Sequence, residues 1–174
     1  EEATQINGRS LLMLSTGISA GFGCVLFPEG TSHDESSMLR FRTGPFRTVF
    51  AAAALAKASN KPLPAVIPIG LHFREREKFR TDVWVEYGSP HTIGEEEIPL
   101  DLVQAVSHGN WVEPPAESVF SLRDKIRTQL VPLTPNTSTW EEYHALQLMG
   151  HVESLRTNQP LVSWREEVQS ARAL

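Results

Sequence analysis

The sequence predicts an α/β fold in which a sheet is flanked by helices, followed by a helical C-terminal region. Three observations support this prediction. Short apolar runs bounded by Gly and Pro alternate with helical segments over residues 1–94. The 174-residue chain is 40% hydrophobic and 21% charged, as is usual for globular proteins. Residues 95–174 instead combine helical spacing with an acidic composition.

The first elements follow from apolar spacing and from Gly and Pro. A helix is expected over residues 5–20, where Leu and Ile recur at helical intervals. The apolar run 24–27 is expected to be a buried strand, with Cys24 as an inert core thiol. A polar loop should cover residues 28–44. Gly44-Pro45 then opens an alanine-rich helix that ends near Ser59, since Pro suits the first turn of a helix.

Two further strands are expected in the same half of the chain. One covers residues 65–71 and should be bulged at Pro68, because Pro has no N–H for a sheet ladder. The other covers residues 82–87, where Val alternates with polar or aromatic residues. The division at residue 94 separates this part from an acidic, mainly helical extension.

The C-terminal region contains three helix signals. Pro114-Pro115 precedes a segment with apolar residues on one helical face. Thr139 and Glu142 have the spacing of a capping box and start a second helix. After Pro160 at most a short amphipathic helix is expected.

Composition excludes several functional classes. A single cysteine excludes an internal disulfide and a zinc site built from cysteines, and no metal-ligand cluster or nucleic-acid motif is present. No signal peptide and no apolar run long enough to span a membrane is found. The net charge is −5, yet residues 40–80 hold nine Lys and Arg against two Glu. This local excess of positive charge suits an anionic ligand or an anionic membrane surface.

The segment Phe27-Pro28-Glu29-Gly30-Thr31 is the strongest local motif. It follows a predicted buried strand, and ligands of α/β sheets bind at the carboxyl ends of strands. Gly30 would let the backbone approach a ligand closely, and Glu29 could orient a hydroxyl or a basic side chain. A turn with a polar tip explains the same residues without a function.

Three ordered segments resemble the conserved blocks of the glycerolipid acyltransferase family: Phe27-Pro-Glu-Gly-Thr31, Leu39-Arg-Phe-Arg-Thr-Gly-Pro-Phe46 and Val66-Ile-Pro-Ile69. The resemblance covers residues 22–90 and includes the Gly-Ser-Pro that ends at Pro90. The variant Pro-Glu-Gly-Thr-Ser-His-Asp is similar to that of fungal-type glycerol-3-phosphate or dihydroxyacetone-phosphate acyltransferases. The resemblance implies an acyltransferase-like sheet, with the third and fourth family blocks in residues 1–94.

The resemblance also implies a reaction and its participants. An acyl chain would move from acyl-CoA or acyl carrier protein to glycerol 3-phosphate or a related phosphorylated acceptor in phospholipid synthesis. No cofactor beyond this co-substrate is implied. The enzyme would be associated with a membrane surface at its cytoplasmic face, and no nucleic acid or metal takes part. The implied substrate-binding residues are Phe27, Pro28, Glu29, Gly30, Thr31, Arg42 and Pro68, with His33, Arg40 and Arg47 as further candidates.

Two departures from the family pattern shape these expectations. The sequence contains no His-x4-Asp, the block in which the family's His acts as general base and Asp orients it. We therefore expect Glu1 not to be the native start, the base to lie upstream, and this chain alone to be inactive. Ser32 replaces an Arg found in many members, so Arg42 is the first choice for binding the phosphate.

Three alternative functions are open or excluded at this point. The chain could belong to a lysophosphatidate acyltransferase of the same family. It could instead be a non-catalytic phosphate- or lipid-binding domain that kept the binding blocks without the base. Gly17-Ile-Ser-Ala-Gly21 matches a serine-hydrolase elbow in letters only, because a helix precedes it and a strand is expected to follow.

Overall fold

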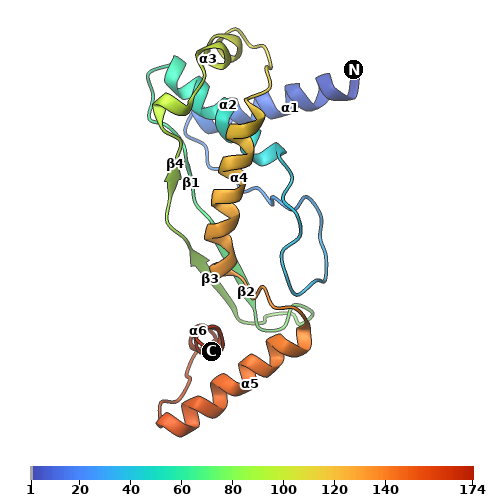
Figure 1. Ribbon diagram of the computed structural model, residues 1–174, viewed down its shortest axis with the longest axis vertical. Coiled ribbons are helices and arrows are strands. Elements are labelled where there is room, and N and C mark those ends of the chain that lie inside the picture. Colours follow the sequence, from blue (N-terminus) through green and yellow to red (C-terminus); the bar gives the residue numbers. More distant parts are fainter. Residues whose placement is uncertain (1) are drawn as a thin grey trace. The chain divides into compact units, whose positions relative to one another are not determined.

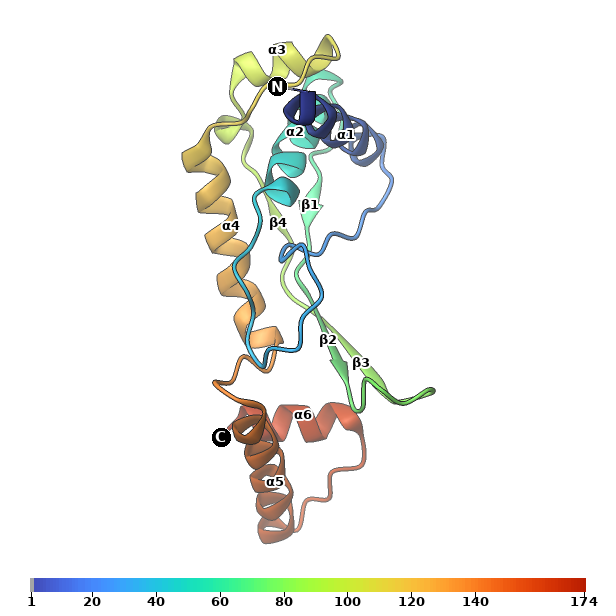
Figure 2. The same cartoon turned by 90° about the vertical axis from the view of Figure 1, so that its right-hand side faces the viewer.

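The computed structural model describes residues 2–174, and side chains from residue 8 onward (Figures 1 and 2). The chain divides into two compact units that alternate along the sequence. The first unit contains the residues up to 31, with residues 40–67 and 89–127; the second contains residues 32–39, 68–88 and 128–174. Each unit is described by itself.

The first unit is mainly helical. Its helices are α1 (Glu2–Ser19), α2 (Gly44–Ala58), α3 (Leu100–Ser107) and α4 (Ala116–Leu130), whose last three residues fall in the second unit. A short antiparallel ribbon pairs β1 (Ala65–Val66) with β4 (His91–Thr92), and the 3-10 turn η1 (Glu95–Glu97) follows. Helix α2 packs against both α1 and α3 (Figure 1).

The core of the first unit is built on α2. Its run Ala51–Ala54 is fully buried, since side chains this small let neighbouring elements approach closely. Phe46 and Phe50 of the same helix are also buried. The buried Ser15 hydroxyl of α1 donates a hydrogen bond to the Thr48 carbonyl of α2 at 3.0 Å, which ties these two helices together.

The second unit joins a β-ribbon to two helices. Strands β2 (Ile69–Phe73) and β3 (Val83–Tyr87) are antiparallel, with Leu71 opposite Val85. The turn η2 (Val131–Leu133) and helices α5 (Trp140–Thr157) and α6 (Trp164–Arg172) complete the unit. Gly70 permits the contact of β2 with η2, because a Cβ there would collide with the Leu133 carbonyl oxygen.

One face of the β2–β3 ribbon is apolar and accessible. Side chains alternate between the two faces of a strand, so every second residue shares this face. Its six residues are 37% to 67% exposed: Ile69, Leu71, Phe73, Val83, Val85 and Tyr87. The opposite face carries His72 and Glu86, and β3 contacts α6. An apolar face of this size is an association or aggregation surface in a chain of this length.

The helices agree with the sequence-based predictions. The predicted helices 5–20 and 44–59 correspond to α1 and α2, and the helices expected after Pro115 and at Thr139 are α4 and α5. Helix α3 lies in the acidic extension, before the first of the three helices expected there from individual sequence signals. No described helix combines the length and hydropathy needed to cross a membrane.

The prediction of a buried strand over residues 24–27 is wrong for this structure. These residues have no regular structure and are exposed, and the Cys24 thiol is exposed rather than part of a core. A strand needs a neighbour that accepts and donates its backbone hydrogen bonds, and among the described residues none pairs with this segment.

The predicted strand 65–71 is interrupted where the bulge was expected. Pro68 separates β1 from β2, because it cannot donate to a ladder. The two ribbons have two strands each, and the flanked α/β sheet stays a prediction. The division at residue 94 also stays a prediction.

Candidate functional site

The Phe-Pro-Glu-Gly motif forms a tight turn in the first unit. The Gly30 N–H donates to the Phe27 carbonyl at 3.1 Å, which closes a four-residue turn. Pro28 at its second position and Gly30 at its fourth are the residues that such turns favour. Gly30 has φ +70°, a conformation open to glycine and strained for other residues. Phe27 is 71% exposed.

Arg42 lies directly against this turn. Its backbone N–H donates to the Pro28 carbonyl at 2.7 Å, which holds residues 28 and 42 side by side. A Cβ on Gly30 would lie 3.0 Å from Cγ of Arg42, so the absence of a side chain at position 30 makes room for the Arg42 stem. Glu29 and Thr31 are held by contacts of their own. The structure therefore brings the predicted acceptor-phosphate residue onto the predicted motif.

Arg40 lies in a different setting from Arg42, although only Phe41 separates them. Phe41 is 3% exposed, while the arginines on both sides are exposed. Arg40 lines a hollow of about 350 Å³ with Arg123, Asp124 and Arg127 of α4. Among the described residues no carboxylate pairs with the guanidinium group of Arg40 or Arg42.

Arg47 is used within the first unit. It lies on α2, and its Nε is 3.1 Å from a carboxylate oxygen of Glu113. Both side chains are partly exposed, so this ion pair contributes little to stability. An arginine already held by a carboxylate is a weaker phosphate ligand than an unpaired one, so Arg47 is a poorer candidate than Arg42.

His33 and Pro68 belong to the second unit. The His33 Nδ1 accepts a hydrogen bond from the Glu35 backbone N–H at 3.2 Å, which structures the loop 32–39. Asp34 forms an ion pair with Arg76, and its carbonyl accepts from Trp140 Nε1 at 2.7 Å. The Pro68 carbonyl accepts from the Gly88 N–H at 2.8 Å. These residues have structural contacts in their own unit.

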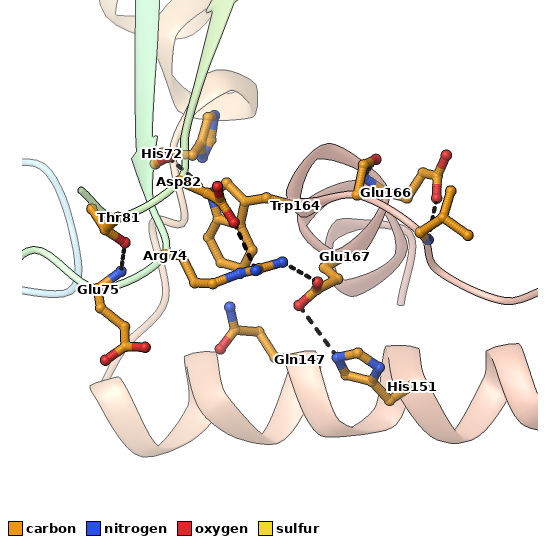
Figure 3. Close-up of polar contacts among 12 residues, drawn as sticks. His72, Arg74, Glu75, Thr81, Asp82, Gln147, His151, Trp164, Glu166 and Glu167 are labelled. Atoms are coloured by element: carbon orange, nitrogen blue, oxygen red, sulfur yellow. Dashed lines mark hydrogen bonds and ion pairs between the residues drawn. The ribbon is translucent and has the colours of Figure 1, made fainter. Parts of the chain in front are cut away.

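Arg74 is the centre of a polar network in the second unit (Figure 3). It forms ion pairs with Asp82, at 2.7 Å, and with Glu167 of α6. The second Glu167 oxygen lies 3.4 Å from His151 of α5, so the carboxylate joins both helices to the ribbon. The Arg74 guanidinium also lies 5.3 Å from the Trp164 ring centroid. Much of the positive charge of residues 74–78 is thus neutralised internally.

His72 is the buried titratable group of this unit. It is 3% exposed, stacks on Trp84 with ring centroids 4.8 Å apart, and neither of its ring nitrogens has a hydrogen-bond partner. Glu86 lies 3.4 Å from Nε2. Burial, and then the charge of Arg172, lower the pKa of His72 and outweigh the opposite effect of Glu86. The ring is therefore neutral at pH 7.

A larger hollow of about 640 Å³ lies in the second unit between η2, α5 and α6. Tyr143, Leu146 and Val168 give it an apolar wall, and Arg172 donates to Glu86 across it at 2.6 Å. It contains none of the residues predicted for the site. Arg172 and Glu86 neutralise each other, so this pair leaves no net charge in the hollow to bind a ligand.

Two curated yeast proteins are similar to this chain. Glycerol-3-phosphate O-acyltransferase 2 of Saccharomyces cerevisiae is 33% identical over 127 residues, which is 72% of this chain and 15% of that protein. Glycerol-3-phosphate O-acyltransferase 1 of the same yeast is 30% identical over 122 residues, which is 70% of this chain and again 15% of that protein. The chain thus spans about 15% of the length of these relatives.

The chain is related to the glycerolipid acyltransferases. This relationship confirms the resemblance read from the three sequence blocks. No family model matches the chain, and no solved structure matches it.

In this relative of the glycerolipid acyltransferases, two arginines that line the hollow beside Arg40 were not among the residues predicted from the sequence. Arg123 and Arg127 lie one helical turn apart on α4, beside the apolar positions Leu122 and Ile126. The spacing of four residues put both guanidinium groups on one face, and this signal was present in the sequence. Their proximity to Arg40 was not, because it depends on how α4 packs.

Proposed function

We propose that this chain is part of a glycerolipid O-acyltransferase that moves an acyl chain from acyl-CoA or acyl carrier protein to glycerol 3-phosphate or a related phosphorylated acceptor. The observation that carries the proposal is the similarity to two glycerol-3-phosphate O-acyltransferases over about 70% of the chain. The reaction would serve phospholipid synthesis at the cytoplasmic face of a membrane.

The turn at residues 27–30 and Arg42 would form the acceptor-phosphate side of the site. The Arg42 guanidinium is exposed and has no carboxylate partner among the described residues, so it can bind a phosphate without first breaking an ion pair. Helix α2 begins two residues later, at Gly44, and its first N–H groups add partial positive charge. Both features favour an anion at this place.

The proposed chemistry is an acyl transfer that needs a general base. The acceptor hydroxyl oxygen would attack the thioester carbonyl, forming the new C–O bond while the C–S bond breaks. The hydroxyl proton would pass to a histidine and then to the departing thiolate. The sequence has no His-x4-Asp block, so the base would come from another segment of a longer protein.

Arg42→Ala in the full-length enzyme tests this assignment. Losing a hydrogen-bonded charge from the phosphate should raise the KM for the phosphorylated acceptor about ten- to a hundredfold. The KM for the acyl donor should stay nearly constant. Arg42→Lys should recover part of the loss, since Lys keeps the charge without the planar fork.

Arg156→Ala, on an exposed turn of α5, is the matched control and should leave both KM values unchanged. If Arg42→Ala weakens only the donor, Arg42 belongs to the donor's phosphates. Assays with glycerol 3-phosphate, dihydroxyacetone phosphate and lysophosphatidate side by side distinguish the acceptors within the family.

A further inference from the structure

The segment between the Phe-Pro-Glu-Gly turn and Arg42 is a loop that is closed at its base. The Arg42 N–H donates to the Pro28 carbonyl at 2.7 Å, so residues 29–41 leave and return at the same place. The ends of the loop belong to the first unit, and its middle, residues 32–39, belongs to the second. Contacts that fix this middle therefore act, through the chain itself, on both the turn and Arg42.

Two hydrogen bonds fix the middle of the loop to the residues around the start of α5. The Ser36 hydroxyl donates to the Thr137 carbonyl at 2.9 Å, and both residues are buried. The Trp140 Nε1–H donates to the Asp34 carbonyl at 2.7 Å. Asp34 also forms an ion pair with Arg76, but both side chains are exposed and such a pair contributes little. The two hydrogen bonds are thus the main restraints.

The partners of the loop are themselves held in place. Trp140 is the first residue of α5, directly after the N-cap Thr139. Its ring meets the Tyr143 ring edge on, with centroids 5.7 Å apart, and the Arg76 guanidinium lies 5.9 Å from its centroid. The Thr137 hydroxyl donates to the Thr139 carbonyl at 3.0 Å. Because these groups are ordered by other contacts, little entropy is lost when they hold the loop.

Fixing the middle of the loop restricts its two ends. With residues 34–36 held, only the shorter segments 29–33 and 37–41 lie between fixed points, and a shorter segment has fewer conformations to lose. This matters most at Gly30, since glycine has the largest backbone freedom in the unfolded chain and here adopts φ +70°. The order of the turn and of Arg42 thus depends on contacts made at the far end of the loop.

We propose that Trp140 is a positioning residue of the acceptor site. It holds the loop 29–41 and so keeps the turn 27–30 and Arg42 in the arrangement that receives the acceptor phosphate. Trp140 lies outside residues 22–90, the part of the chain that resembles the family's blocks. The proposal deepens the proposed function and rests on it for the identity of the ligand.

Amide hydrogen exchange of the 174-residue chain tests this coupling without any assay of activity. Trp140→Phe keeps an aromatic ring and removes the Nε1–H donor. The Arg42 N–H should then exchange several-fold faster, at most about fivefold, the equivalent of one net hydrogen bond. Ser36→Ala removes the other hydrogen bond of the loop and should raise the same rate, also where Trp140→Phe fails to fold. An unchanged rate in either folded variant overturns the proposal.

Trp164→Phe is the matched control within the second unit. The Trp164 Nε1–H also donates to a backbone carbonyl, that of His72, at 2.8 Å, and neither residue belongs to the loop. This variant should leave the exchange of the Arg42 N–H unchanged. Equal acceleration in Trp164→Phe and Trp140→Phe would be a general loss of stability and would overturn the proposal.

Kinetics of the full-length enzyme test the consequence for the acceptor. Trp140→Phe should raise the KM for the phosphorylated acceptor about threefold and leave kcat and the donor KM nearly constant, whereas a mere loss of folded enzyme lowers the apparent kcat. In the background of Arg42→Ala the same change should have little further effect, because Trp140 acts through the loop that carries Arg42.

The outcomes separate this inference from the proposed function. If Arg42→Ala raises the acceptor KM and Trp140→Phe does not, Trp140 has only a structural role and the proposal is overturned. If Arg42→Ala itself leaves the acceptor KM unchanged, the assignment of Arg42 in the proposed function is wrong. The exchange rates of the Arg42 N–H then decide by themselves whether Trp140 orders the loop.

Discussion

Gly30 shows how one residue can position another. Its φ of +70° is strained for any other residue, and a Cβ there would lie 3.0 Å from Cγ of Arg42, so the Arg42 stem would have to shift to make room. Any larger residue would strain the turn and push Arg42 away from it. The glycine of the motif therefore makes room for Arg42, twelve positions later in the chain. The sequence pattern alone does not reveal this contact.

We expect Gly30→Val in the full-length enzyme to abolish activity, and Gly30→Ala to raise the KM for the phosphorylated acceptor. In the background of Arg42→Ala, the Gly30→Ala change should have a much smaller effect, because the residue that it displaces is already gone. Kinetics with the acceptor varied measure this, and circular dichroism checks the fold. Additive effects of the two changes would contradict the coupling.

Glu29 has contacts of its own in the structure, and its role in the site stays a prediction. We expect Glu29→Ala in the full-length enzyme to remove activity while the protein still folds. Glu29→Gln, which keeps the shape and loses the charge, separates orientation of a hydroxyl from simple packing. Wild-type activity in Glu29→Ala would mean that the segment is an ordinary turn and that Glu29 has no role in the site.

His72 makes the stability of the second unit depend on pH. Its pKa is lowered in the folded state by burial and by Arg172, so the unfolded chain takes up the proton more readily. Stability is therefore complete above the unfolded value of about 6.5 and decreases as the pH falls from there toward the folded pKa. Trp84, Glu86 and Arg172 are the groups that face the ring.

We expect His72→Leu to reduce this loss of stability between pH 7.5 and 5. Urea unfolding of the chain at the two pH values measures the difference in free energy of unfolding. The exposed His144→Gln on α5 is the control and should keep the wild-type pH dependence. If His72→Leu and the wild type lose the same stability between the two pH values, His72 is not the cause of the pH dependence.

At the scale of the element, helices α5 and α6 begin in the same way. Thr139 and Ser163 are the N-caps, and their hydroxyls accept from the backbone N–H of Glu142 and Glu166 at 3.1 and 3.3 Å. Each glutamate in turn accepts the backbone N–H of the residue just before the cap. The predicted capping box at Thr139 is thus confirmed with a shift of one residue in its second bond.

We expect Thr139→Ala to destabilise the second unit by about 1 kcal/mol, the usual cost of losing an N-cap hydroxyl. Thr139→Ser should restore most of that stability, because the hydroxyl is kept. Thermal unfolding followed by circular dichroism measures both variants. No change in Thr139→Ala would show that α5 depends on packing rather than on its cap.

The same scale explains why the helices were easier to predict than the strands. Caps, proline positions and apolar spacing act over a few residues, so α1, α2, α4 and α5 could be predicted from local signals. The run 24–27 has a strand-like composition, yet a strand also needs a partner whose position the local sequence does not specify. Pro68 could be predicted as an interruption because its missing N–H is a local property.

At the scale of the whole molecule, the chain carries binding blocks without a recognisable base. It contains no His-x4-Asp, and the His33 Nδ1 is used by the Glu35 backbone. A general base usually contributes about 10²–10⁴ to the rate. We therefore expect the 174-residue chain alone to show no thioester release with glycerol 3-phosphate above the blank. Robust turnover would require a base within this chain.

The sequence by itself determined the family relationship, most helix positions and the turn at Gly30, because each depends on residues that are neighbours in the chain. Only the tertiary structure decided which arginines are available to a ligand. Arg74 and Arg76 lie in ion pairs with carboxylates distant in sequence, whereas Arg42 lies against the turn and Arg40 meets α4. Charge can be counted from a sequence, but its neutralisation depends on which distant side chains folding brings within a few ångströms.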